Sequence, residues 1–196
     1  MRGFVGLRMA ALVGGILVVA GLFCAVGEGQ AQQSQLIFEH PFIIAARTGD
    51  LATVQDMLAR GDSPDVRDKE GQTPLMIATI NGNIDIAETI IGVAGKLDAK
   101  DNQGNTALGW AAIQNQLDIS EMLLNAGASP DIQNRQGMTP LMQAAKAGRY
   151  IQVEFMLQRR PDLTLKDYTG RSVLGWARQS RDRRLVSLLE NFGARD

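Results

Sequence analysis

Histidine and cysteine, the side chains that most often perform nucleophilic or metal chemistry, are scarce in this chain of 196 residues. It holds one His, His40, and one Cys, Cys24. A zinc site needs several such ligands, and a disulfide or a Cys–His nucleophile pair needs two side chains together. We therefore expect no catalytic residue, no metal site and no cofactor, and the sequence predicts a protein that is not an enzyme. His40 is expected to cap or flank a helix.

Two acidic stretches, residues 62–68 and 98–101, offer carboxylates of the kind that bind calcium. They lack the alternating oxygen ligands and the closing glutamate of an EF-hand loop, so we interpret them as turns. The glycines that follow the first segment are evenly spaced instead of clustered, which argues against a phosphate-binding loop. A net charge of -1 supplies no basic field, and we expect no nucleic-acid partner.

The elements that would position any functional side chain follow from a repeat of 33 residues. Glycine recurs with this step at Gly71, Gly104, Gly137 and Gly170. The same step relates four leucines and four alanines: Leu75, Leu108, Leu141 and Leu174, and Ala78, Ala111, Ala144 and Ala177. A degenerate copy, HPFIIAARTGDLATVQDML, precedes them. One register held over successive copies predicts a solenoid, because a single unit of this kind cannot bury its own apolar face.

Each copy predicts a turn followed by two short helices. Thr73 is a natural N-cap, and Pro74 is a natural first helical residue because its missing N–H would be unpaired there in any case. Gly82 can take the left-handed conformation that ends this helix. The second helix carries an apolar face of its own, with Ile86 and Ile90 as examples. Stretches such as DKEGQ supply the turn residues between helix pairs.

The repeat resembles the ankyrin repeat, whose pattern is close to D-x-x-G-x-T-P-L-x-x-A-A-x-x-G. The resemblance covers about residues 36–196 and implies an all-α ankyrin-repeat solenoid of stacked helix-turn-helix pairs with β-turn or hairpin loops. The expected repeats are about 36–67, 68–100, 101–133, 134–166 and 167–196. Ankyrin domains usually bind other proteins, so the resemblance implies a protein–protein interaction module or scaffold. Its partner would contact the turn tips and the concave helix face.

Two departures from the family pattern concern the first helix of each repeat. The family commonly has His after TPL, where this chain has Met76, Gly109, Met142 and Gly175. Glycine costs about 1 kcal/mol against alanine inside a helix, so the two glycine sites need room. Trp110 and Trp176 follow these glycines in alternate repeats, which hints at duplication of a two-repeat unit. Each Trp either packs against the neighbouring repeat or serves as an aromatic anchor in the groove.

The resemblance also places the candidate partner contacts, because ankyrin proteins vary their turn tips and inner helix faces for recognition. The candidate partner-binding residues are Lys69, Glu70, Gln72, Asn102, Gln103, Asn105, Trp110, Arg135, Gln136, Met138, Lys146, Tyr168, Arg171 and Trp176. We expect charge reversals at Arg135 and Arg171 to weaken binding while leaving thermal stability nearly unchanged.

The first 31 residues have the layout of a secretory signal peptide. Arg2 and Arg8 lead, residues 9–26 form an uncharged apolar run, and the small residues Gly29 and Ala31 suit a cut after Ala31. An uncleaved N-terminal membrane anchor is the alternative, because the apolar run approaches spanning length. In both cases the remaining chain is exported. We predict a periplasmic protein, with inner-membrane anchoring toward the periplasm and secretion as alternatives.

Charge is uneven along the part of the chain that would be exported. Residues 32–142 carry 7 basic and 14 acidic side chains, whereas residues 143–196 carry 11 basic and 6 acidic ones. These are either ordinary solvated faces, or a means to steer a partner, or a basis for head-to-tail self-association. We expect the partner to be another exported protein, with membrane contact only if the first segment stays uncleaved. A chaperone-like or stress-protective factor for a periplasmic enzyme and a membrane-tethered scaffold are the alternative functions.

Overall fold

The computed structural model describes residues 39–93 and 95–195, and the elements named below belong to one compact unit, His40–Asp196. The predictions made for residues 1–31 lie outside the described residues. Among the helices of the described part, none is both long enough and apolar enough to cross a lipid bilayer.

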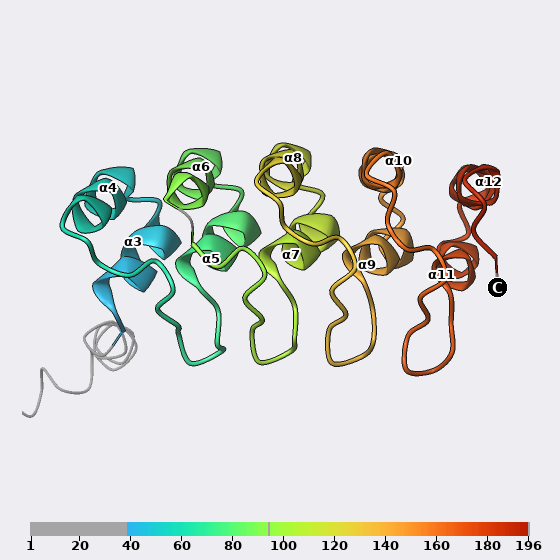
Figure 1. The fold of residues 1–196 in the computed structure, drawn as a ribbon, viewed down its shortest axis with the longest axis horizontal. Coiled ribbons are helices and arrows are strands. Elements are labelled where there is room, and N and C mark those ends of the chain that lie inside the picture. Colours follow the sequence, from blue (N-terminus) through green and yellow to red (C-terminus); the bar gives the residue numbers. More distant parts are fainter. Residues whose placement is uncertain (1–38, 94, 196) are drawn as a thin grey trace, which may run out of the picture. The chain divides into compact units, whose positions relative to one another are not determined.

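The described residues form ten helices in five successive pairs. The pairs are α3 (Pro41–Thr48) with α4 (Leu51–Ala59), α5 (Pro74–Asn81) with α6 (Ile84–Gly92), α7 (Ala107–Gln114) with α8 (Leu117–Asn125), α9 (Pro140–Lys146) with α10 (Tyr150–Leu157), and α11 (Val173–Ser180) with α12 (Arg183–Asn191). Figure 1 shows the pairs side by side in chain order, with the first helices in one layer and the second helices in another. The predicted all-α solenoid is confirmed.

The first helix of each pair begins at a side-chain cap. Thr73 Oγ1 accepts the N–H of Met76 at 3.3 Å, and Pro74 opens α5. The later first helices begin in the same way, at Thr106, Thr139 and Ser172. In the leading repeat, His40 replaces the hydroxyl residue, and its Nδ1 accepts the N–H of Phe42 at 3.2 Å. The capping role expected for His40 is confirmed, and the cap supplies a partner for an N–H that the helix leaves unpaired.

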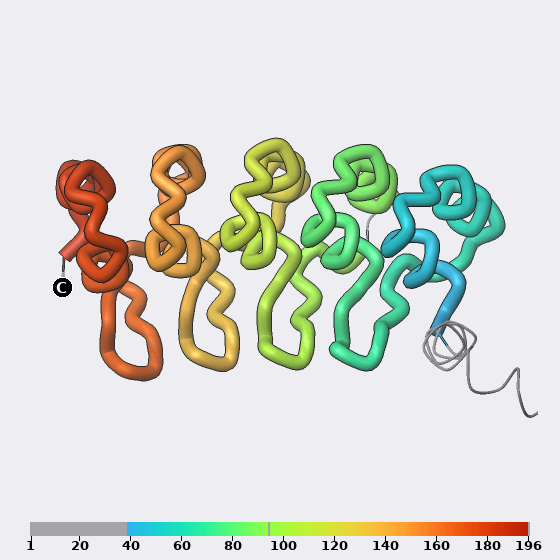
Figure 2. Tube along the Cα trace, turned by 180° about the vertical axis from the view of Figure 1, so that it is seen from behind, coloured from blue at the N-terminus to red at the C-terminus, as the bar shows by residue number. Residues whose placement is uncertain are grey.

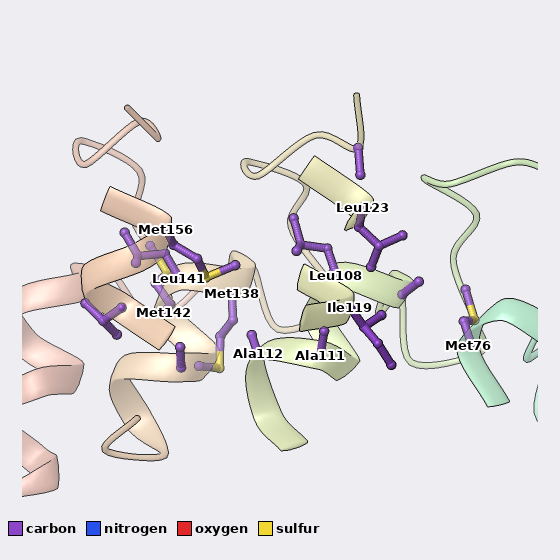
Figure 3. Packing of buried hydrophobic residues seen from close by; sticks show 14 of the residues in the cluster. Met76, Leu108, Ala111, Ala112, Ile119, Leu123, Met138, Leu141, Met142 and Met156 are labelled. Carbon is purple, nitrogen blue, oxygen red and sulfur yellow. The ribbon is translucent and has the colours of Figure 1, made fainter. Parts of the chain in front are cut away.

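The hydrophobic core runs from repeat to repeat without interruption. Its recurring members are the leucines after each cap, which are at most 3% exposed: Leu75, Leu108, Leu141 and Leu174. Figure 3 shows Ile119 of one repeat, and Met138 and Met156 of the next, within the same cluster. Met76 and Met142 are each 1% exposed at the place where the family commonly has His. Apolar packing thus takes the place of a buried polar contact at these positions.

At some of the repeat glycines, neighbouring turns pack too closely to leave room for a side chain. Gly104 has a φ of 80°, and a Cβ on it would lie 2.7 Å from the backbone nitrogen of Arg135 in the next turn. Gly170 of the last repeat has a φ of 81°, but a Cβ there would meet no atom within 4 Å. Glycine is therefore needed at 104 for both conformation and space, and at 170 for conformation alone.

Candidate binding groove

The turn tips form a continuous row because backbone hydrogen bonds join each one to the next. These bonds run from Asn102 N–H to Glu70 O (2.9 Å), from Arg135 N–H to Gln103 O (3.0 Å), and from Tyr168 N–H to Gln136 O (3.1 Å). Figure 2 shows the resulting row of loops, all of which extend from the same side of the helix pairs. The candidate contact residues at the tips are therefore held in a fixed mutual arrangement.

The side chain of an aspartate or asparagine accepts backbone N–H groups of each turn and so holds the turn in shape. Asp101 Oδ1 accepts the N–H groups of Gln103 and Asn105, both at 2.8 Å. The equivalent residues of the other full repeats accept N–H groups in the same way: Asp68, Asn134 and Asp167. This is the Asx-turn geometry that favours Asp and Asn at such positions. Asp68 and Asp101 are thus turn formers, as the sequence predicted.

Asp167 is a buried carboxylate whose surroundings favour its charged form. Burial by itself raises the pKa of this group. Hydrogen bonds from the hydroxyl and N–H of Thr169, the N–H of Arg171 and the indole of Trp176 outweigh that effect. The pKa of Asp167 therefore lies below its ordinary value, and the ionised carboxylate holds the last turn together.

Both tryptophans bind the second oxygen of these turn aspartates. Trp110 Nε1–H donates to Asp101 Oδ2 at 2.9 Å, and Trp176 Nε1–H donates to Asp167 Oδ2 at 3.0 Å. In the alternate repeats, Gln143 and an isoleucine stand where the tryptophans would be. Each Trp thus ties the first helix of its repeat to the turn that precedes it, a bond that sequence reasoning did not anticipate.

Trp176 is packed rather than available to a partner. Two cations lie over its ring, with Arg171 Cζ 4.3 Å and Lys146 Nζ 4.7 Å from the ring centre, and the residue is 9% exposed. Lys146 belongs to the preceding repeat, so these contacts join two repeats. Of the two interpretations left open for this tryptophan, packing against the neighbouring repeat holds and the exposed anchor does not.

The glycines before the tryptophans make room for polar side chains. A Cβ on Gly109 would lie 2.7 Å from Gln143 Oε1, and a Cβ on Gly175 would lie 2.7 Å from Arg171 Cγ. Because these glycines have no side chain, Gln143 and Arg171 can lie close to the helices. The protein accepts the lower helix propensity of glycine at these two positions in exchange for this contact. This accounts for the room that the sequence indicated at both positions.

A groove of about 650 Å³ lies between the loops and first helices of two neighbouring repeats. We call it the Trp110 groove, and its lining residues are Asn102, Gln103, Asn105, Trp110, Ile113, Asn134, Arg135, Gln136, Met138, Gln143, Lys146 and Ala147. Trp110 is half-buried in it, while Arg135, Gln136 and Lys146 are exposed. Most of the candidate contacts predicted for these two repeats are thus brought to one place.

Two of these candidates are not exposed tip residues, which corrects the expectation for them. Asn105 is 4% exposed, and its Oδ1 accepts hydrogen bonds from Asn134 Nδ2 (2.9 Å) and Gln143 Nε2 (2.6 Å). Met138 is 3% exposed and belongs to the hydrophobic core. The backbone N–H of Asn105 bonds to Asp101, and that of Met138 bonds to Asn134. With their side chains buried, the two residues form the wall of the groove instead of its rim.

The remaining candidates lie elsewhere on the row of turns. A smaller hollow, of about 290 Å³, is lined in part by three of them: Lys69, Glu70 and Gln72. Tyr168 is 72% exposed on the last turn, next to the contacts between Arg171 and Trp176. The structure therefore does not unite all the candidates in a single site.

Asn134 and Gln143 are groove residues that the list of candidates omitted. They occupy, one repeat later, the positions that Asp101 and Trp110 hold in the preceding repeat. Gln143 is 6% exposed and Asn134 is 7% exposed, and both bind Asn105. The sequence did contain a signal for both residues. At two positions of the 33-residue register, Asn replaces Asp and Gln replaces Trp.

Two family models match the chain. One, described as ankyrin repeats (3 copies), matches residues 42–134, and the other, described as ankyrin repeats (many copies), matches residues 123–174. Together with the stacked helix pairs, these matches show that the chain belongs to the ankyrin-repeat family. Ankyrin repeats are in general non-catalytic modules that mediate protein–protein interaction. No curated protein matches the chain.

Proposed function

We propose that this protein is a binding module that holds a segment of a partner protein in the Trp110 groove. The observation that carries the proposal is the groove itself, where a hollow of about 650 Å³ is bordered by exposed polar side chains on rigidly joined turns. Binding sites combine a mainly apolar hollow with a few polar groups that fix the orientation of the guest. Trp110, Ile113 and Met138 are the apolar part, and the amide and cationic side chains are the polar part.

The proposal includes an exported compartment, with another exported protein as the partner. What supports this is the sequence of the first 31 residues: a basic start, an uncharged apolar run and small residues before the expected cut. The only Cys of the chain, Cys24, lies in that segment, so residues 32–196 need no disulfide and rely on packing alone. We place the working protein in a bacterial periplasm.

Site-specific photo-cross-linking in the source cells tests the binding site. A benzophenone amino acid in place of Gln136, on the rim of the groove, should form a covalent adduct with a second protein after illumination. The matched control carries the same amino acid in place of Glu154, which is exposed on α10 of the same repeat but does not line the groove. Adducts that form only from position 154, or equally from both positions, would contradict the proposed site.

Cell fractionation with N-terminal mass analysis tests the compartment. We expect the protein in the periplasmic fraction with Gln32 as its first residue. A protein recovered from the cytoplasm with Met1 intact would overturn the exported assignment without affecting the binding site.

A further inference from the structure

The charge that borders the Trp110 groove is of one sign. Arg135 and Lys146 line it, and its lining includes no aspartate or glutamate. Within the described residues, no carboxylate pairs with the guanidinium of Arg135, whose backbone N–H alone is engaged. The turn carboxylate of Asp101 is 7% exposed, and its two oxygens are occupied by backbone N–H groups and by the Trp110 indole. An anionic group in the groove would therefore meet cations and no competing acid.

The wall of the groove also holds an acceptor without a donor. Gln143 is 6% exposed, its Nε2 donates to Asn105, and no described residue donates to its Oε1, which lies over Gly109. Gln143 Oε1 is not sealed from solvent, because within the described residues the one buried side-chain polar atom without a partner is Gln152 Oε1; a donor that enters the groove can therefore become its hydrogen-bond partner. The backbone N–H of a bound segment can supply that partner, and the exposed amide of Gln136 on the rim can bind a neighbouring peptide group.

The remaining lining is suited to an apolar side chain. Trp110 and Ile113 are half-buried, and Met138, which lines the same groove, is buried. The Trp110 indole is fixed by its bond to Asp101, so little side-chain freedom is lost when a guest packs on it. A rigid aromatic surface of this kind commonly anchors a bound segment.

From these three features we propose that the partner presents an extended acidic segment, with carboxylates toward Arg135 and Lys146, a backbone N–H toward Gln143 Oε1, and an apolar side chain against Trp110. The inference rests on the proposed function and names the chemistry of the segment that the groove binds. The smaller hollow near the first turns does not share this preference, because its lining combines Arg47 and Lys69 with Asp68 and Glu70.

The Trp110 groove lies where the two charge regions of the chain meet, since its lining runs from Asn102 in the acidic region to Lys146 and Ala147 in the basic one. Residues 32–142 carry an excess of acidic side chains and residues 143–196 an excess of basic ones. An acidic segment is therefore repelled from the leading repeats and attracted toward the part of the row that begins at Lys146. Attraction of this kind weakens as salt is added.

Fluorescence anisotropy of labelled synthetic peptides tests the inference on the full chain. The probes are a short blocked peptide of alternating leucine and glutamate, a companion with glutamine at each glutamate, and a second companion with lysine there. We expect the glutamate peptide to bind at least about tenfold more tightly than the glutamine peptide at low salt, and the lysine peptide to bind most weakly. Equal affinity for the three peptides, or a preference for lysine, would overturn the proposed chemistry.

Charge variants assign the preference to the groove. Arg135→Glu should remove most of the advantage of the glutamate peptide, and Arg135→Gln should remove part of it. Arg183→Glu is the control, because it changes the net charge as much as Arg135→Glu does, at an exposed residue outside the groove. It should leave the preference for the glutamate peptide nearly intact. An equal loss in the Arg183 variant would overturn the assignment, because it would show that overall charge alone attracts the peptide.

The outcome of cross-linking separates this inference from the proposed function. An adduct from position 136 together with no preference for glutamate would overturn the acidic segment and leave the binding groove in place. Absence of that adduct would instead count against the proposed function itself.

Discussion

At the scale of single residues, the hydrogen bond between a tryptophan and a turn aspartate explains why tryptophan stands in the first helix of two of the repeats. Trp176 donates to Asp167, and Lys146 and Arg171 lie over its ring. Asp167 in turn accepts three hydrogen bonds from the turn that it closes. One indole thus connects a helix, a turn and the preceding repeat.

Trp176→Phe should destabilise the protein by about 1–3 kcal/mol, because it removes the N–H that binds a buried carboxylate oxygen while keeping an aromatic ring near the two cations. Urea denaturation followed by circular dichroism measures this loss. Trp110→Phe is the matched control, and it should cost less because water can reach the half-buried site. An unchanged midpoint for the Trp176 variant would show that the indole bond adds no stability.

Asp167 gives a pH dependence of stability whose sign follows from its pKa. Its pKa is lowered in the folded state, so its contribution is present above its unfolded pKa and is lost as the pH falls through the folded value. Below about pH 4, Asp167→Asn should therefore lose less stability than the wild type. Asn134 accepts the same turn N–H groups in the preceding repeat, so Asn at position 167 can keep the turn bonds, while it loses the bond from Trp176 equally at every pH. Thermal unfolding across pH checks this, and parallel curves for the two proteins would contradict it.

At the scale of elements, the second helices pack less uniformly than the first. Gln152 on α10 is fully buried at the repeat position that Ile86, Ile119 and Leu185 hold in α6, α8 and α12. Its Nε2 donates to Ser120 on α8, and its Oε1 has no hydrogen-bond partner. A buried acceptor without a donor weakens the contact between these two helices.

Gln152→Leu combined with Ser120→Ala should therefore stabilise the protein, by about 1 kcal/mol, because it removes both the unsatisfied amide and the buried hydroxyl that the amide binds. Chemical denaturation measures the gain. Gln55→Leu is the control, since Gln55 is exposed on α4 and the same change should have almost no effect there. A destabilised double variant would mean that the bond between Gln152 and Ser120 outweighs the missing partner of Gln152 Oε1.

At the scale of the whole repeat unit, stability should be a sum over helix pairs and the contacts between neighbours. Leu141 lies in a middle repeat and is 2% exposed, whereas Ile151 on α10 of the same repeat is 61% exposed. Leu141→Ala should cost about 2–5 kcal/mol, because it leaves a cavity in the continuous core. Ile151→Ala should stay within about 0.5 kcal/mol of the wild type. Equal costs for the two variants would contradict the register of the repeats.

The sequence predicted the fold in detail because its signals are local and recur. The 33-residue step located the helix pairs, and Thr73, Pro74 and His40 marked helix starts through capping that needs no knowledge of distant contacts. The groove was harder to predict because it depends on contacts between repeats. The burial of Asn105 and Met138, for example, follows from how one turn closes over the next.

The most direct test of the Trp110 groove uses the two indole N–H signals in an NMR spectrum of the protein. Trp110 lines the groove, whereas Trp176 contacts Lys146 and Arg171 and is not part of the lining. The two signals are assigned with the Trp→Phe variants, and the ligand is a peptide copied from the protein segment that cross-links to position 136. The Trp110 signal should move as this peptide is added, and it should move further than the Trp176 signal, which senses the groove only through Lys146. Movement of the Trp176 signal alone, or of neither signal at a saturating concentration of peptide, would contradict the assignment of the groove as the binding site.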